Sequence, residues 1–432
     1  GRRHIQNLKS IIGLILISVA VFVLNKEAVF PGWLALLPTI GAFLIISAGP
    51  AACANRVILS NRFLVWVGLI SYPLYLWHWP LLSFARIYSE HVPAREVRIA
   101  IVVFSVLLAW ITYRFVEKPI RFRSNSYLKV WLLVVLMAGM AAIGGYIFAH
   151  NGIGWRIPKF IEELSRSNYD VKAGWREHEC YLPTEDDSSK FAELCIEKDK
   201  KPLVFLWGDS YAAALYPGLK SLQKSYSFAI AQHTASACAP LLGWQSPDRK
   251  FCKGINDVNI ALIAKIRPDI VLLHGNWFAE YVPGYREGKE IYYDISKLEA
   301  TVSELKKIGL QNIILIGPPP QWQDSMSKQL VKYWKNNLQI GVPPVRLRLG
   351  LVDSIPALDV RMENLSKQLG IKYISAYHAM CNKEGCLTRR TLEDTSITTF
   401  DNGHFSEHGS VMLFDKIGEQ LANRAGLSPI QQ

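Results

Sequence analysis

Residues 203–219 read LVFLWGDSYAAALYPGL, and this stretch decides the fold. Its first five residues are all apolar, which is typical of a strand buried on both faces of a sheet. The strand predicted over residues 203–207 ends at Gly208-Asp209-Ser210, and a helix is predicted over residues 212–223. This order places Ser210 at the carboxyl end of a strand, where parallel α/β sheets bind their ligands.

The same alternation of strand and helix continues toward the C-terminus. Further strands are predicted at residues 227–231, 270–274, 312–316 and 372–375, and further helices at residues 258–266, 295–307, 356–369 and 407–425. Short apolar strands separated by helices predict a parallel sheet with helices on both faces. We therefore predict a three-layer, flavodoxin-like α/β domain over residues 201–432, with an insertion at 322–353 that we expect to form a flap.

Ser210 has two interpretations. A serine at a strand end can give its proton to a base and attack a carbonyl carbon, and the N–H groups of the next helix can stabilise the resulting oxyanion. Alternatively, Ser210 is only the N-cap of that helix, because serine is one of the best capping residues. The tripeptide alone does not separate these two roles.

A second polar cluster, FDNGHFSEHGS, lies near the C-terminus at residues 400–410. Asp401 precedes His404 by three residues, so its carboxylate can accept the Nδ1–H of the imidazole and leave Nε2 free for a serine. His408 is the alternative base, although we expect it to lie in a helix capped by Ser406. The third piece is Asn276, after the strand at 270–274, whose amide can donate to an oxyanion or can form a simple Asx turn.

The first third of the chain is far more apolar than the rest. Half of the 432 residues are hydrophobic, and the mean hydropathy is +0.13. Five apolar runs are predicted to span a membrane, at residues 10–24, 33–48, 63–82, 99–116 and 128–149. Residues 1–149 are therefore predicted to form a membrane segment, and polar residues 150–200 a linker or extension.

The charge of the chain follows the same division. Residues 1–150 hold fourteen Lys and Arg against four Glu, so they carry +10 of the net charge of +12. Nucleic acid is therefore not a predicted partner, and the lipid bilayer is. If Arg2 and Arg3 are cytoplasmic, the positive-inside rule and five spans place the domain after His150 on the opposite side, although Arg86, Arg95 and Arg98 do not follow the rule.

Six of the seven cysteines fall after residue 150 and form three close pairs in the sequence: Cys180/Cys195, Cys238/Cys252 and Cys381/Cys386. Local pairs of even number predict disulfides and an oxidising compartment. The cysteine and histidine spacings do not match the usual zinc patterns, so we predict no metal site.

At these motifs the soluble half resembles the SGNH hydrolase family. GDSY with Ser210 resembles the family's first block, GNW with Asn276 its third, and DNGH with Asp401 and His404 its last. The resemblance implies that Ser210 is the nucleophile, His404 the base and Asp401 the orienting acid, with Asn276 and the Ser210 N–H stabilising the oxyanion. No residue here clearly matches the glycine of the second block.

The membrane half resembles the C-terminal part of the acyltransferase-3 family. The resemblance rests on GLISYPLYLWHWPLL, residues 68–82, and FVEKPIR, residues 115–121. Fused acyltransferase-3/SGNH proteins are bacterial O-acetyltransferases that modify surface glycans, and their membrane domain has further helices at its N-terminal side. We therefore expect this chain to be the C-terminal portion of such a protein, in the bacterial inner membrane with residues 201–432 in the periplasm.

Together these features predict an acetyl relay. The resemblance implies acetyl-CoA as the donor to the membrane domain, with no cofactor bound in this chain, and a surface glycan such as lipopolysaccharide O-antigen as the acceptor. Two alternatives stay open: a membrane-tethered acetyl esterase, and a glycan-binding domain with catalysis in the membrane. His78 is a candidate for a membrane site, because a histidine within a span is costly, but the flanking Trp77 and Trp79 equally indicate an interfacial aromatic belt.

Overall fold

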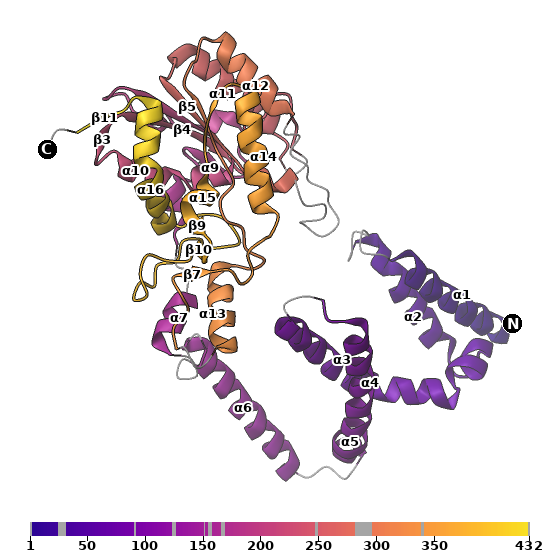
Figure 1. Ribbon diagram of the computed structural model, residues 1–432. Helices are drawn as coiled ribbons and strands as arrows, with labels where there is room; N and C mark the ends of the chain where they lie inside the picture. Colours follow the sequence, from indigo (N-terminus) through magenta and orange to yellow (C-terminus); the bar gives the residue numbers. More distant parts are fainter. Residues whose placement is uncertain are drawn as a thin grey trace. The chain divides into compact units, whose positions relative to one another are not determined.

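The computed structural model describes residues 2–24, 32–89, 92–122, 127–150, 152–153, 158–165, 169–246, 249–280, 296–337 and 341–430 (Figure 1). The chain divides into two compact units, Gly1–Gly144 and Gly145–Gln432. We call them the membrane unit and the α/β unit, and each is described by itself.

All five apolar runs of the membrane unit are helical. The main helices are α1 (Arg2–Val23), α2 (Leu36–Ala48), α3 (Arg62–Ser89), α4 (Arg95–Thr112) and α6 (Tyr127–Ala149), with the short α5 (Lys118–Phe122) after α4. Within the described residues, three helical stretches are long and apolar enough to cross a membrane: Arg3–Val23, Arg95–Arg121 and Tyr127–Ala149. The apolar helix Trp33–Ala48 is shorter, and α3 is long enough but is diluted by Tyr, Trp, His and Pro. Five spans therefore remain a prediction.

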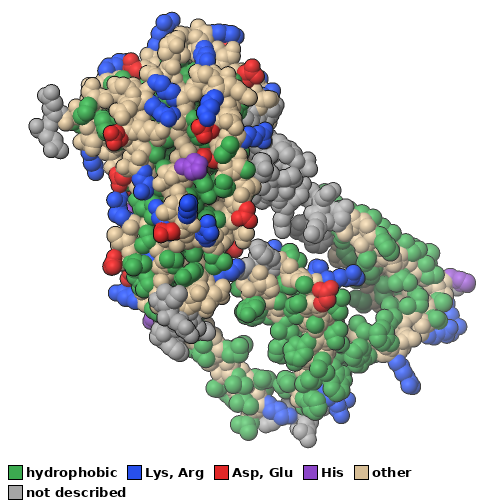
Figure 2. Space-filling model, viewed as in Figure 1, with side chains coloured by type: hydrophobic (Ala, Val, Ile, Leu, Met, Phe, Trp, Pro, Cys, Tyr) green, Lys and Arg blue, Asp and Glu red, His purple; other side chains and the backbone are tan. Residues whose placement is uncertain are grey.

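Small and polar side chains hold α1 against its neighbour. A Cβ on Gly13 would lie 2.6 Å from the carbonyl oxygen of Gly41, so the backbones of α1 and α2 approach closely, as small residues permit in membrane helices. Ser10 donates to the side chain of Asn55 (2.8 Å), and Asn55 donates to the carbonyl of Ile45 (2.9 Å). Large apolar side chains cover the visible surface of this unit instead (Figure 2).

The α/β unit is built on a parallel six-stranded sheet with the order β1-β4-β2-β5-β6-β8. All of its strand pairs are parallel. The strands are β1 (Tyr181–Leu182), β2 (Leu203–Gly208), β4 (Ala229–Ala235), β5 (Ile270–His274), β6 (Ile313–Ile316) and β8 (Lys372–Ile374). The central β2 is buried along its whole length, as its unbroken apolar run predicts.

Helices cover both faces of this sheet, which confirms the predicted three layers (Figure 1). Phe205 and Trp207 of β2 belong to the core under α11 (Cys252–Ile266), α12 (Lys297–Lys307) and α14 (Ile355–Gln368). Val204 and Leu206 point to the opposite core, which α10 (Tyr216–Leu222) and α16 (Glu407–Ala425) complete. The helix predicted over residues 212–223 is divided into α9 (Ser210–Ala213) and α10.

Residues 150–200 are not a loose linker where the structure describes them. They form α7 (Lys159–Ser165), α8 (Val171–Trp175) and β1, which pairs with β4 and extends the sheet. The α/β unit thus begins well before the predicted boundary at residue 201. The polar composition hid this because β1 has only two residues and a disulfide holds the segment.

The predicted flap at residues 322–353 also has a packed structure. It contains α13 (Met326–Asn336) and β7 (Arg346–Leu347), which belongs to a small sheet with β9 (Cys381–Asn382) and β10 (Gly385–Leu387). Met326 and Leu330 of α13 share a buried cluster with Ile161 and Leu164 of α7. A second small sheet pairs β3 (Tyr226–Ser227) with β11 (Ser428–Pro429).

The three predicted disulfides are formed, Cys180–Cys195, Cys238–Cys252 and Cys381–Cys386. Cys53 of the membrane unit is a free, exposed thiol.

Candidate active site

The turn after β2 is shaped by close contact with the neighbouring strand. A Cβ on Gly208 would lie 1.7 Å from the carbonyl oxygen of His274 in β5, so only glycine fits. The next residue, Asp209, is buried and is the N-cap of α9. One of its carboxylate oxygens accepts the N–H of Tyr211 (2.8 Å) and the other accepts the N–H of Asn276 (2.7 Å). Because Asp209 is the cap, the hydroxyl of Ser210 is not needed for that role.

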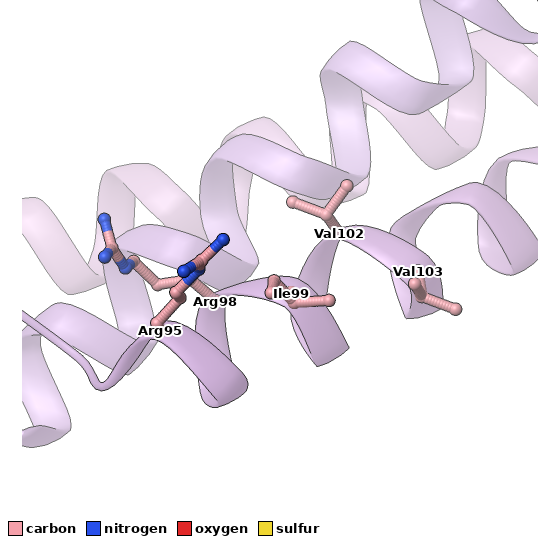
Figure 3. Close-up of a pocket in the computed structure, with 5 residues that line it drawn as sticks. All are labelled: Arg95, Arg98, Ile99, Val102 and Val103. Atoms are coloured by element: carbon pink, nitrogen blue, oxygen red, sulfur yellow. The ribbon is translucent and has the colours of Figure 1, made fainter.

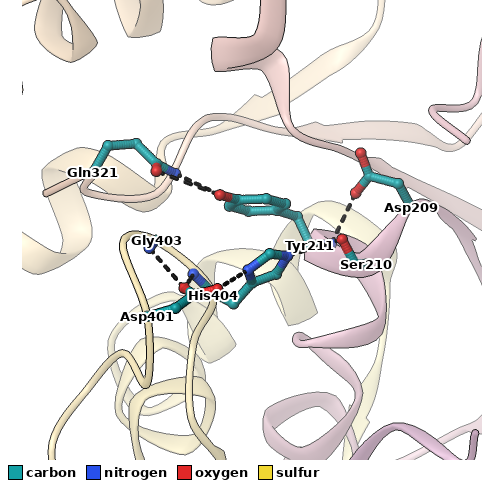
Figure 4. A network of polar contacts seen from close by, with 7 residues as sticks. All are labelled: Asp209, Ser210, Tyr211, Gln321, Asp401, Gly403 and His404. Carbon is teal, nitrogen blue, oxygen red and sulfur yellow. Dashed lines mark hydrogen bonds and ion pairs between the residues drawn. The ribbon is translucent and has the colours of Figure 1, made fainter. Parts of the chain in front are cut away.

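Ser210, His404 and Asp401 form one hydrogen-bonded chain (Figure 4). Oγ of Ser210 lies 2.8 Å from Nε2 of His404, and Nδ1 of His404 lies 2.6 Å from Oδ2 of Asp401. When Nδ1–H donates to the carboxylate, Nε2 is the acceptor for the serine proton. The structure thus brings Ser210 together with His404, which lies 194 positions later in the sequence, and with the neighbouring Asp401.

Asp401 is held as a carboxylate. Its second oxygen accepts the backbone N–H groups of Gly403 (2.9 Å) and His404 (2.7 Å). Burial by itself raises the pKa of Asp401, but the hydrogen bonds and charge of His404, together with the two N–H donors, hold the pKa below its ordinary value. The carboxylate is therefore ionised at neutral pH and can orient the imidazole.

His408, the alternative base, is exposed in the first turn of α16. Ser406 caps this helix by accepting the N–H of Gly409 (3.1 Å), as the sequence predicts. His408 makes no contact with Ser210 among the described residues, so the geometry favours His404.

Several residues that sequence reasoning missed support His404. The Tyr211 ring lies 4.0 Å from the imidazole, centroid to centroid, and its hydroxyl is 3.3 Å from the side chain of Gln321. Gln321 also packs on the loop of residues 400–404, because a Cβ on Gly403 would lie 2.2 Å from it. Trp322 donates its backbone N–H to the carbonyl of Asn402 (2.7 Å). Gln321 and Trp322 gave no signal beyond their place after β6, at the same edge of the sheet, and Tyr211 gave none beyond its place next to Ser210.

Asn276 lies at this edge too, after β5. Its backbone is fixed by Asp209, the residue before Ser210. Its side-chain Oδ1 is buried without a hydrogen-bond partner in the described part of the chain, so this oxygen is not satisfied by internal contacts. This suits a group that meets a ligand.

The neighbouring His274 is a buried histidine that the sequence did not single out. Its Nδ1 lies 3.0 Å from the carbonyl oxygen of Ile316, and burial lowers its pKa to about 4. His274 therefore stays neutral at neutral pH and adds no charge beneath the site.

His78 lies in α3 of the membrane unit. Its Nδ1 is bonded to the carbonyl of Leu74 in the same helix (2.9 Å), and Trp77 donates to Thr112 of α4 (2.9 Å). A shallow pocket of about 380 Å³ on α4 is lined by Arg95, Arg98, Ile99, Val102 and Val103 (Figure 3). His78 does not line this pocket. A role for His78 in a membrane site therefore stays a prediction.

The fold and the hydrogen-bonded Ser210, His404 and Asp401 define an α/β domain with a candidate Ser-His-Asp site at the carboxyl edge of its sheet. A family model described as an SGNH domain fused to AT3 domains matches residues 179–419, which is more than half of the chain. The chain therefore belongs to this family.

A solved structure is similar to this chain over a slightly longer stretch than the family model. The periplasmic domain of a lipopolysaccharide acetyltransferase from Salmonella ser. Paratyphi A is 30% identical, with a TM-score of 0.50. The match covers 60% of this chain and 99% of that domain. The family resemblance and the α/β fold predicted from the sequence are thus confirmed.

Among curated proteins, the O-acetyltransferase OatA of Staphylococcus aureus strain NCTC 8325 is 37% identical over 81 residues. A candidate O-acetyltransferase of S. aureus strain COL is 32% identical over 111 residues. These matches cover 18% and 25% of this chain, but only 13% and 18% of the two relatives.

Proposed function

We propose that the protein acetylates a hydroxyl group of a bacterial surface glycan, with lipopolysaccharide O-antigen as the first candidate. The observation that carries this proposal is the chain from Ser210 through His404 to Asp401, with contacts of 2.8 and 2.6 Å. The acetyltransferase names of the similar proteins support transfer, and the name of the Salmonella domain supports a lipopolysaccharide acceptor.

The first half of the reaction loads the enzyme. Oγ of Ser210 attacks the acetyl carbonyl carbon while Nε2 of His404 takes its proton, and the leaving group departs with that proton. Asp401 keeps the imidazole oriented and balances the charge of the imidazolium. The N–H of Ser210 and the amide of Asn276 are the proposed donors to the oxyanion of each tetrahedral intermediate.

The second half unloads it. A glycan hydroxyl gives its proton to His404 and attacks the acetyl ester, and the proton then returns to Oγ of Ser210 as the new ester leaves. Ser210 is regenerated, so each cycle moves one acetyl group and no net proton is left on the protein.

The membrane unit fits the supply side of this reaction. Its apolar helices suit insertion in a bilayer, and three disulfides suit a periplasmic α/β unit. We propose that the protein lies in the bacterial inner membrane and that the acetyl group originates from cytoplasmic acetyl-CoA. The pairing of membrane and SGNH domains in the family supports a relay across the membrane.

Two alternatives make different predictions. An acetyl esterase would use the same three residues but would pass the acetyl group to water rather than to a glycan. A glycan-binding domain would not need Ser210 at all. The hydrogen bonds from Ser210 to His404 and from His404 to Asp401 argue against a domain that only binds glycan, because binding alone does not need a serine aligned with a histidine base.

The test uses the full chain in detergent with a chromogenic acetyl ester, with and without an O-antigen oligosaccharide. Ser210→Ala should lower ester turnover by about a thousandfold or more. Ser221→Ala, a half-buried serine on the next helix, is the matched control and should have no effect. Transfer of the acetyl group to the oligosaccharide supports the transferase, and release of acetate without such transfer supports the esterase. Normal acetylation by Ser210→Ala contradicts both.

A further inference from the structure

The segment just before the family-matched region reaches the site. Trp175, the last residue of α8, has its ring 5.4 Å from the His404 imidazole and 5.8 Å from the ring of Phe400. Tyr169, two residues before α8, has its ring 5.3 Å from Phe400. Phe400 in turn is stacked at 18° to His404, 5.8 Å away. The rings of Tyr169, Trp175 and Phe400, from two distant segments, therefore form one continuous aromatic wall beside the base.

This wall is firmly built. Asp170 caps α8 by accepting the N–H groups of Lys172 (3.0 Å) and Ala173 (3.3 Å). The buried Gln232 of β4 donates to the carbonyl of Trp175 (3.0 Å). A Cβ on Gly174 would lie 2.3 Å from the Tyr169 hydroxyl, so Tyr169 folds closely over this glycine.

The backbone directly after Trp175 adopts strained conformations. Arg176 and His178 have left-handed φ values of 59° and 62°, although neither is glycine. Such conformations cost free energy and persist where the surroundings enforce them, often next to functional sites. The surroundings that enforce these two conformations also keep Tyr169 and Trp175 in place against the loop of residues 400–404.

The chemistry of deacylation says what must lie against this wall. The acceptor hydroxyl has to come within hydrogen-bonding distance of Nε2 of His404 to lose its proton. The sugar ring that carries this hydroxyl therefore rests on the side chains flanking His404. Of these, Tyr211 and Trp175 are 5% and 3% exposed, whereas Phe400 is only half-buried, as is Tyr169, which lies against Phe400 on the side of the wall away from the direct His404 contacts.

We propose that Tyr169 and Phe400 form the acceptor subsite of the proposed acetyltransferase, on which the ring of a pyranose packs. One face of a pyranose carries mainly C–H groups, so it can bury apolar area on an aromatic ring as another apolar group would. The ligand class is thus a cyclic sugar, and Tyr169 is a specificity-determining residue. This inference rests on the proposed function.

The experiment compares two acceptors on the full chain in detergent, loaded with an acetyl ester. A methyl pyranoside has a ring face, whereas glycerol offers hydroxyl groups without one. In the wild type, transfer to the pyranoside should exceed transfer to glycerol. Tyr169→Ala should reduce this ratio about three- to tenfold, as expected for one lost stacking partner, and Tyr169→Phe should restore it. Phe251→Ala, an aromatic residue that is 36% exposed elsewhere, is the control.

The outcomes separate the subsite from the proposed function. If Tyr169→Ala leaves the ratio of pyranoside to glycerol transfer unchanged, or reduces transfer to both acceptors equally, the proposed subsite is wrong. The acetyl-enzyme of the proposed function is not affected by that result. Absence of any acetyl-enzyme in the wild type overturns the proposed function instead. In that case saturation-transfer NMR of the methyl pyranoside still tests the subsite, because a subsite requires weaker binding by Tyr169→Ala than by the wild type and Tyr169→Phe.

Discussion

The two units of this chain solve opposite solvation problems. In the α/β unit the largest apolar side chains, such as Trp207, Phe205 and Phe414, are buried on the two faces of the sheet. In the membrane unit the large apolar side chains point outward, with Phe22 87% and Trp33 85% exposed. The hydrophobic effect in water drives apolar side chains into the core of the α/β unit, whereas apolar side chains on the surface of the membrane unit can face lipid. Burial is therefore a guide to stability in one unit and not in the other.

The units also differ in where polar chemistry is found. In the α/β unit, buried polar residues such as Asp209 and His274 gather at the carboxyl edge of the sheet, around Ser210. In the membrane unit the buried polar residues of the described part are Ser10, which donates to the side chain of Asn55, and Ser105, which donates to a carbonyl of its own helix. The comparison supports placing the proposed acetyl-enzyme chemistry in the α/β unit.

The largest expected effect comes from making the same substitution in both units. Leu206→Ala removes a fully buried side chain of β2, and it should lower the free energy of unfolding of the α/β unit by about 2–5 kcal/mol. Leu132→Ala removes a side chain of α6 that is 58% exposed and should leave that unfolding transition unchanged. Urea titrations followed by tryptophan fluorescence check both. A loss in Leu132→Ala equal to that in Leu206→Ala would break the comparison.

A smaller effect is expected from the cysteines. The disulfide Cys180–Cys195 closes a loop with a sequence separation of 15 and fastens β1 to the sheet. Replacing both cysteines by serine should destabilise the α/β unit by about 3 kcal/mol, whereas Cys53→Ser in the membrane unit should not. Thermal unfolding of the two variants compares them, and equal melting temperatures would count against a structural role for this disulfide.

The smallest effect, when counted per pH unit, concerns the protonation of buried histidines. Burial lowers the pKa of His233 and that of His274 to about 4 in the folded α/β unit, while an unfolded histidine titrates near 6.5. The unfolded chain therefore binds these protons first, so stability falls as pH decreases from about 6.5 to about 4, by about 1 kcal/mol per pH unit for each histidine. His233→Gln should remove one share of this slope. An identical slope in the variant would mean that His233 is not buried as a neutral group.

Much of the fold could be predicted because its strands are short, apolar and separated by helices. β2 and β5 match their predicted ranges to within one residue. Residues 169–200 could not be placed in this way, because β1 has two residues and its position depends on pairing with β4 and on a disulfide. α13 was missed for a similar reason: its apolar stripe is completed by α7, a partner that is distant in sequence.

The site shows the same limit. Ser210, Asn276, Asp401 and His404 could be found because each follows a strand or forms a recognisable motif. Tyr169, Trp175 and Gln321 carry no local signal, since their proximity to His404 arises only when the chain is folded. The capping question also needed the structure, which assigns that role to Asp209 rather than Ser210.

The most direct measurement is the mass of the full chain after brief exposure to an acetyl ester, followed by peptide mapping. The account predicts one added acetyl group on the peptide that contains Ser210, absent in Ser210→Ala and removed when a glycan acceptor is added. A folded, disulfide-bonded wild type that gains no acetyl group, or gains one that persists in Ser210→Ala, would contradict the central claim.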